Sequence, residues 1–157
     1  IRWDRTLKAI KNFKEFLKEG IVKKQSPDKS RAKFLIKESE NSNKSLLELI
    51  EKIKLSDVNA NMFIRLCYDI LMELIRSKML LDGYNASGQG AHEAEVSYLR
   101  LLNFKENQIQ FFNSLRYFRN GIIYYGKIMD KEYAQKVIDF TIDNYKHIKK
   151  TLDNDIQ

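Results

Sequence analysis

The sequence predicts an all-α protein, an up-and-down helical bundle of four main helices with additional short helices. Chain breakers are scarce, because the 157 residues include only 6 Gly and 1 Pro. Apolar side chains recur every three or four residues over long segments, and no segment alternates convincingly as a strand. We expect a single domain over residues 1–157, with a basic N-terminal helix in residues 1–25 and a core bundle in residues 28–152.

The first expected helix covers residues 3–24. Its apolar side chains recur at helical spacing and form one stripe, made of Trp3, Leu7, Ile10, Phe13, Leu17 and Ile21. Lys8, Lys11 and Lys18 are expected together on its flank. The segment QSPDKS then ends the pattern.

The second expected helix covers about residues 28–54, with Ser26 or Asp28 as its cap. Its apolar stripe consists of Ala32, Leu35, Leu46, Ile50 and Ile53. Ser39 and Ser42 continue the stripe through a polar middle, where small side chains would permit the close approach of another helix. A break of the helix at the sequence NSN is the alternative.

The third expected helix, residues 57–82, is apolar nearly all round and is therefore central or at a subunit interface. Ser56 or Asp57 is its expected N-cap and Gly83 its C-cap. The following loop, GYNASGQGAHE, holds three glycines but lacks the spacing and the Lys-Ser/Thr pair of phosphate-binding loops. Further helices are expected over residues 91–102, 105–125 and 130–152.

The basic charge is concentrated at one end of the chain. Residues 1–54 hold 15 Lys+Arg against 8 Asp+Glu, whereas residues 55–157 hold 13 of each. Such an excess attracts phosphate backbones or acidic proteins. A solvated, lysine-rich surface that confers solubility is the alternative interpretation.

The sequence predicts no metal site and no cofactor. Two histidines and one cysteine are present, without the spacing of zinc or di-iron ligands, and no nucleophile turn of the GxSxG type occurs. No 18-residue run is wholly apolar, so we expect no membrane contact. The single Cys67 excludes an internal disulfide and is consistent with a cytoplasmic protein.

The two histidines are assigned structural positions. His92 follows Gly90-Ala91 at a helix start, where we expect it to cap the helix or to bond a loop carbonyl. His147 lies near the C-terminus of the last helix, where a partial positive charge is favourable, and is expected at the surface.

The segment RYFRNGIIYYG, residues 116–126, places polar groups in an apolar helix. Arg116, Arg119, Asn120 and Ile123 share one side, offset from the core stripe of the same helix. The arginines could reach solvent or pair with Asp69, Glu73 or Glu95. Because Asn and Gly weaken a helix interior, we favour a polar groove or interface here.

This segment resembles the signature of the HEPN domain family, which is often written R-N-x-x-x-H. Arg119 and Asn120 match the pattern, and Tyr124 stands at the histidine position. The long apolar helix FIRLCYDILMELIRSKMLLDGY, the glycine-bearing loop, the GAHEA histidine and the short helix after it are also similar to this family. The resemblance covers about residues 28–150, and it implies a helical bundle.

The resemblance implies a metal-independent endoribonuclease whose two copies form one cleft. Arg119 would hold the scissile phosphate and Asn120 would accompany it, while the residue at position 124 would move protons. Tyr124 departs from the pattern. Because a free tyrosine has a pKa of about 10, against about 6.5 for histidine, a tyrosine at this position is a poor proton acceptor at neutral pH. His92 could replace the missing histidine only if the fold brings it to Arg119.

The leading hypothesis is a catalytically degenerate HEPN-like homodimer that binds RNA, a nucleotide or a partner protein. Arg116 and Arg119 would bind the ligand, with Lys8, Lys11 and Lys18 as further nucleic-acid contacts. A nucleotidyltransferase-type partner in a toxin–antitoxin system is implied by the resemblance. The alternatives are an active endoribonuclease that uses Arg119 with Tyr124 or His92, and a non-catalytic scaffold.

Overall fold

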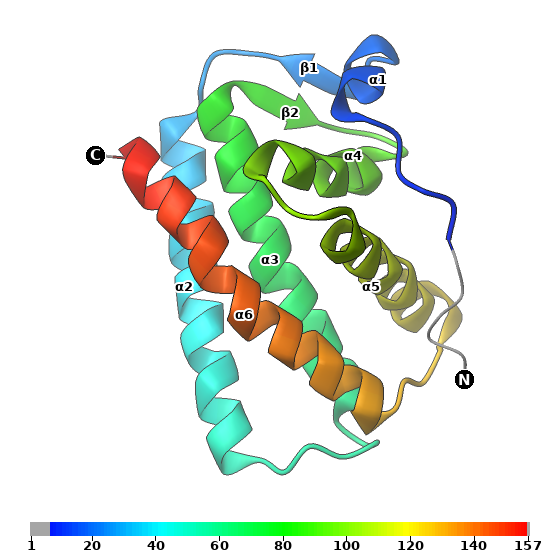
Figure 1. Ribbon diagram of the computed structural model, residues 1–157. Coiled ribbons are helices and arrows are strands. Elements are labelled where there is room, and N and C mark those ends of the chain that lie inside the picture. The colour runs from blue at the N-terminus through cyan, green and yellow to red at the C-terminus, as the bar shows by residue number, and fades with distance from the viewer. Residues whose placement is uncertain (1–6, 157) are drawn as a thin grey trace.

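The computed structural model describes residues 7–156, which form a helical bundle with a small two-stranded sheet at one end (Figure 1). The predicted all-α class is confirmed. The elements in chain order are α1 (Phe13–Lys18), β1 (Val22–Lys24), α2 (Lys29–Lys52), α3 (Ala60–Asp82), β2 (Tyr84–Ala86), α4 (Ala91–Ser97), the 3-10 helix η1 (Tyr98–Leu102), α5 (Glu106–Tyr125) and α6 (Lys131–Ile156).

Helix α3 is the centre of the bundle. It packs against α2 and α6, and its other sides contact α4 and α5 (Figure 1). This position explains why its sequence lacks a broad polar face. Gly83 ends the helix in the left-handed conformation, with φ of 85°, as the sequence predicted.

Helix α2 continues through its polar middle without a break. Asp28 caps it, because its Oδ1 accepts the backbone N–H of Arg31 at 3.0 Å. The fully buried Ser39 donates its hydroxyl to the Ile70 carbonyl of α3 at 2.8 Å. The predicted close approach of another helix at this serine is therefore confirmed.

Some apolar residues of the expected helices are exposed. Ile50 is 38% exposed, and Ile53 is 40% exposed because it lies past the last turn of α2 in extended conformation. Val58 is 95% exposed, since α3 begins two residues later. Ile142 of α6 is 39% exposed, and the neighbouring Thr141 occupies the buried face instead.

Of the two predicted caps of α3, Asp57 serves another helix and Ser56 accepts the backbone N–H of Val58. Asn59 occupies the N-cap position of α3, whereas the Asp57 carboxylate accepts the Lys131 N–H at 2.9 Å. Asp57 therefore ties the start of α6 to the segment before α3.

In residues 7–156, no helix combines the length and apolarity that a bilayer crossing requires.

The predicted helix over residues 3–24 is wrong. Trp3 lies outside the described residues, and only Phe13–Lys18 is helical among the rest. Arg100 of η1 donates to the carbonyls of Ile10 and Lys11, each at 2.8 Å, so two acceptors that a helix would use internally are bonded to another part of the chain.

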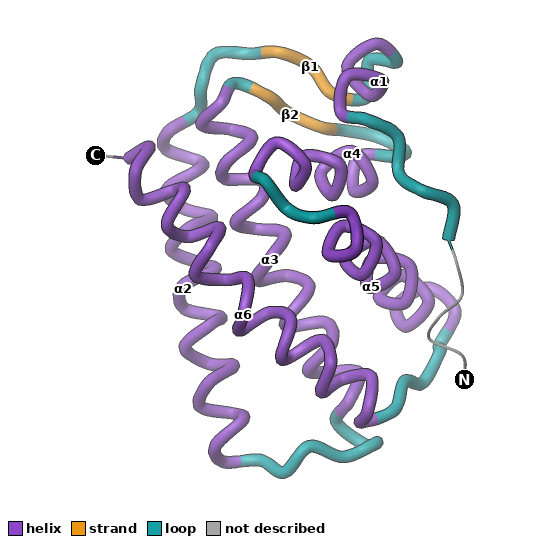
Figure 2. The backbone as a smooth tube through the Cα atoms, viewed as in Figure 1, coloured by secondary structure: helices purple, strands orange, loops and turns teal. Residues whose placement is uncertain are grey.

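Two short strands were not predicted. Strands β1 and β2 pair antiparallel, with Val22 opposite Ala86 and Lys24 opposite Tyr84 (Figure 2). Each strand has three residues, which is too short for alternation to be visible in the sequence. The pairing fixes the start of the glycine-bearing loop that leads from α3 to α4.

Candidate functional site

A groove with a volume of about 380 Å³ lies between the glycine-bearing loop and α5. From the loop and α4 it is lined by residues 88–93, which include His92 and Glu93, and from α5 by Arg116, Asn120 and Tyr124. The three α5 residues are four positions apart, so they project from one face of the helix. The groove thus brings the GAHEA histidine close to Asn120 of the RN motif.

Arg116 is largely buried in one wall of this groove. Its side chain is 15% exposed. Its Nε donates to the Asn113 Oδ1 at 3.0 Å, and its Nη2 lies 3.8 Å from the Glu93 carboxylate. The first bond fixes the side chain within α5, whereas the second is a loose ion pair across the groove.

Arg119 lies beside the groove on the α3 side. Its side chain is 19% exposed, and its guanidinium carbon stands 5.0 Å from the centroid of the Tyr68 ring. One Nη lies 3.9 Å from Asp69, and the other donates to Asn120 at 3.4 Å. Asp69 is one of the three acidic partners that the sequence left open for the arginines, and neither arginine extends into bulk water.

The Nε–H of Arg119 is a buried donor with no hydrogen-bond partner in the described part of the chain. Leaving such a donor unsatisfied costs about 1–3 kcal/mol. Native structures hold few of these groups, and those that persist often belong to functional sites.

His92 contacts Tyr68 rather than capping the helix or bonding a loop carbonyl as predicted. Its Nδ1 lies 3.3 Å from the Tyr68 hydroxyl. Burial lowers the pKa of His92 below its ordinary value, and the charges of Arg76, Arg119 and Arg116 lower it further. The imidazole is therefore neutral at neutral pH.

Tyr68 connects His92 to Arg119. Burial raises the pKa of Tyr68 to about 12, so the phenol keeps its proton. The hydroxyl touches the imidazole while the ring face supports the guanidinium. His92 and Arg119 therefore lie near each other on opposite sides of one tyrosine, and Tyr68 stands between them.

Tyr124 and Arg119 do not converge. Tyr124 is 70% exposed at the rim of the groove, whereas Arg119 faces Tyr68. Positions five apart on a helix differ by about 140° in direction, and α5 stays helical through both. Gly121 does not interrupt the helix, and the Lys127 side chain folds back over it.

The three lysines predicted as nucleic-acid contacts do not share a helical face, because Lys8 and Lys11 precede α1. Lys11 pairs with Glu19 at 2.5 Å and stands over the Phe16 ring. Lys18 lies in the last turn of α1. None of the three lines the groove.

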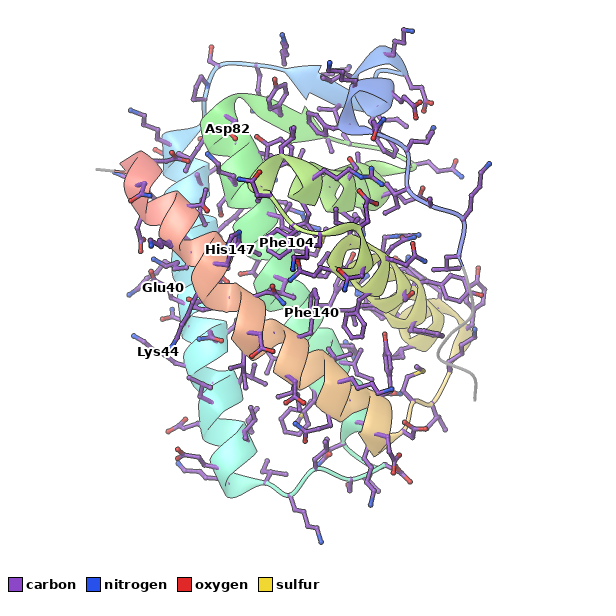
Figure 3. The ribbon with its side chains drawn as sticks, in the orientation of Figure 1. Glu40, Lys44, Asp82, Phe104, Phe140 and His147 are labelled. Atoms are coloured by element: carbon purple, nitrogen blue, oxygen red, sulfur yellow. The ribbon has the colours of Figure 1, made fainter. Side chains whose placement is uncertain are left out.

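His147 is exposed on α6, as predicted, but it is also anchored. Its Nε2 lies 3.1 Å from the Leu102 carbonyl, and its ring meets Phe104 edge-on at 4.9 Å (Figure 3). It therefore joins α6 to the end of η1.

Within residues 7–156, no three His, Cys, Asp or Glu side chains gather as a metal site would require.

The sequence reasoning missed Arg76 and Tyr68. Arg76 donates its Nε to the Glu95 carboxylate at 2.5 Å and lies close enough to His92 to lower its pKa. The sequence did contain an indication of Arg76, because Arg76 follows Asp69 by seven positions and therefore lies on the same face of α3. The contact of Tyr68 with α4 depends on the packing of separate helices.

Comparisons of this chain with protein-family models, with curated proteins and with solved structures found no match. The structure defines the chain as a helical-bundle protein with a groove that Arg116, Asn120 and His92 line. Its membership of the HEPN family stays a prediction from the sequence.

Proposed function

We propose that the groove binds a phosphate group of RNA or of a nucleotide. The observation that carries this proposal is a groove lined by Arg116, Asn120 and His92, with the largely buried Arg119 bonded to Asn120 beside it. Guanidinium groups suit phosphate because their planar donors match its oxygens in pairs. The HEPN resemblance points to the same class of ligand.

The burial of Arg116 and Arg119 and their long ion-pair distances support an anion site. Arg116 and Arg119 are mostly buried, so their attraction for an anion is screened less than at an open surface. Their acidic neighbours stand 3.8 and 3.9 Å away, which are long distances for ion pairs. A phosphate can therefore compete for these donors.

The test measures binding of a fluorescent single-stranded RNA by wild-type protein and by the Arg116→Ala and Arg119→Ala variants. We expect each variant to weaken binding at least tenfold, the effect of about 1.4 kcal/mol. Each lost phosphate contact should also lower the slope of log K against log[salt] by about 0.7.

The control is Lys136→Ala, which removes one exposed positive charge from α6. It should leave the affinity within about twofold, because its charge is solvated and screened. Equal weakening by all three variants would show that net charge alone attracts RNA. Unchanged binding in both arginine variants would refute the groove as the phosphate site.

Endoribonuclease activity is the second candidate, and the position of His92 favours it. His92 would accept the 2′-hydroxyl proton while the 2′-oxygen attacks phosphorus. The bond from phosphorus to the 5′-oxygen would break, and the Tyr124 hydroxyl would protonate that oxygen. The products are a 2′,3′-cyclic phosphate and a 5′-hydroxyl, and the proton then returns from His92 to Tyr124.

The two candidates require different tautomers of His92. A binding site is served by Tyr68 donating to Nδ1, which leaves an Nε2–H donor for phosphate. A general base requires Nδ1–H to donate to Tyr68, which leaves the Nε2 lone pair free. Nitrogen NMR of the imidazole distinguishes these states. Incubation with RNA in EDTA, beside His92→Gln, shows whether cleavage depends on this residue.

A further inference from the structure

We infer that a second hollow, on the other side of His92, is a nucleobase pocket that selects guanine. This inference rests on the proposed phosphate site, because the base would belong to the nucleotide bound there.

The second hollow has a volume of about 440 Å³. It is built by the first turns of α2, the second half of α3, the segment from β2 into the loop, and α4. Sites for small molecules commonly have volumes of about 300–1,000 Å³. A single nucleoside therefore fits.

The two hollows are neighbours. Gly88, Ala91 and His92 line both of them. A phosphate held near His92 by Arg116 would thus place an attached nucleoside at the entrance of the second hollow.

The polar groups of the pocket are a guanidinium and a carboxylate. Glu95 has a side chain that is 5% exposed, and its Oε2 accepts from Arg76 Nε at 2.5 Å. A carboxylate has about four acceptor sites, so Glu95 keeps acceptor capacity beyond this bond. The Arg76 side chain is 33% exposed, and Arg31 adds a second guanidinium at the same hollow.

The apolar part of the lining is small. Leu35 lines the pocket from α2, and Met79 and Leu80 line it from α3, where they are only 2% and 3% exposed. Leu35, which is half-buried, is therefore the apolar side chain best placed to contact a planar ring.

The donor pattern selects the base. Guanine is the RNA base whose pairing edge has two adjacent donors, N1–H and the N2 amino group, beside the O6 acceptor. The donors match the Glu95 carboxylate, and O6 matches the arginines. Adenine, cytosine and uracil would each direct an acceptor at a buried carboxylate, and such a mismatch weakens binding.

The first test uses wild-type protein and measures the affinities of GMP, IMP and AMP by calorimetry. IMP retains N1–H and O6 but lacks the N2 amino group. We expect GMP to bind about tenfold more tightly than IMP, the effect of losing one hydrogen bond to a charged acceptor. AMP should bind more weakly than IMP. Equal affinities for GMP and AMP would overturn the guanine pocket.

The second test changes the protein. Glu95→Gln should abolish the preference for GMP over AMP, provided that thermal unfolding shows a folded variant. Leu35→Trp places a large ring at the pocket wall and should weaken GMP binding without weakening inorganic phosphate binding. A GMP preference that survives in folded Glu95→Gln would also overturn the inference.

The outcomes separate the two proposals. RNA binding that depends on Arg116 and Arg119 but shows no base preference would leave the phosphate site intact and reject the guanine pocket. A protein that binds neither RNA nor any nucleotide would reject the phosphate site as well.

Discussion

Arg119 is held in a polar position inside an otherwise apolar helix by three different contacts. The Tyr68 ring supports its guanidinium, while Asp69 and Asn120 lie at its ends. These contacts explain how the arginine stays mostly buried, and the unsatisfied Nε–H shows that they do not use all its donors. The side chain is therefore positioned with bonding capacity to spare, as an anion site requires.

Two glycines should respond in opposite directions to alanine. Gly83 has φ of 85°, and a Cβ there would lie 2.7 Å from the Gln25 carbonyl oxygen, so Gly83→Ala should destabilise the fold by more than about 1–2 kcal/mol. Gly121 is helical, and its Cβ would meet the flexible end of Lys127. Gly121→Ala should therefore stabilise the protein by up to about 1 kcal/mol.

Urea unfolding of the two glycine variants measures both effects. A loss of stability in Gly121→Ala would mean that the Lys127 side chain cannot move aside. A gain of stability accompanied by weaker RNA binding would instead indicate that the packing of Lys127 on this glycine serves the groove.

Glu73 should make the free energy of unfolding fall as the pH rises from about 4.3 to about 7. Burial raises its pKa to about 7, with contributions from Asp69 and Glu38. Between the unfolded-state pKa of about 4.3 and this value, the folded protein holds a proton that the unfolded chain releases. The free energy of unfolding contributed by Glu73 therefore decreases with pH in this window and is constant above it.

Denaturant titrations between pH 4.5 and pH 8 test the role of Glu73. Glu73→Gln should flatten the decline and make the protein more stable than wild type at pH 8. Glu51→Gln, a change at an exposed carboxylate without burial, is the control. An identical decline in wild type and Glu73→Gln would assign the pH dependence to other groups.

The sequence predicted part of the site. The RN motif could be anticipated from residue types, and Asp69 was one of three acidic residues that the sequence offered as partners for the arginines. The role of Tyr68 could not, since its hydroxyl reaches His92 across 24 positions of sequence. Contacts between separate elements depend on how the helices pack, and a periodic pattern does not contain this information.

At the scale of elements, the N-terminal segment shows how tertiary bonds override a helical pattern. Residues 7–12 carry apolar side chains at helical spacing, yet Arg100 holds their carbonyls. Gly20 then ends α1, and the chain pairs with β2 instead of continuing the helix. The long helices were predicted correctly because their apolar stripes have matching partners on α3.

Arg100→Ala should release this segment. The change removes two bonds to carbonyls and an ion pair with Glu106, so we expect a loss of about 1.5–3 kcal/mol in stability. Hydrogen exchange should rise in residues 7–24 more than in α3. Arg65→Ala, at an exposed position of α3, is the matched control. Unchanged protection of residues 7–24 would show that their apolar contacts alone hold them.

At the scale of the whole molecule, the largest buried side chains belong to several elements and form one core. Helix α3 contributes most of them, so its packing determines where Tyr68, Asp69 and Arg76 point. The second hollow lies where α4 meets this helix, and the groove lies where α4 and its preceding loop meet α5. The position of the site is therefore a consequence of the bundle rather than of one loop.

The exposed end of α5 predicts self-association. Tyr124 and Tyr125 of α5 are 70% and 80% exposed, Ile128 just after the helix is 74% exposed, and Tyr124 also lines the groove. Exposed apolar groups gathered in one place are typical of contact surfaces. We expect a homodimer through this end, in agreement with the two-copy cleft that the HEPN resemblance implies.

Sedimentation velocity at tens of micromolar tests the dimer. Ile128→Glu should shift the protein to monomer, because a carboxylate buried in an apolar seam loses its hydration without gaining a partner. Phe34→Glu is the matched control, since Phe34 is 62% exposed on α2, away from α5. A wild-type protein that remains monomeric at this concentration would contradict the predicted homodimer and the cleft shared between its two copies.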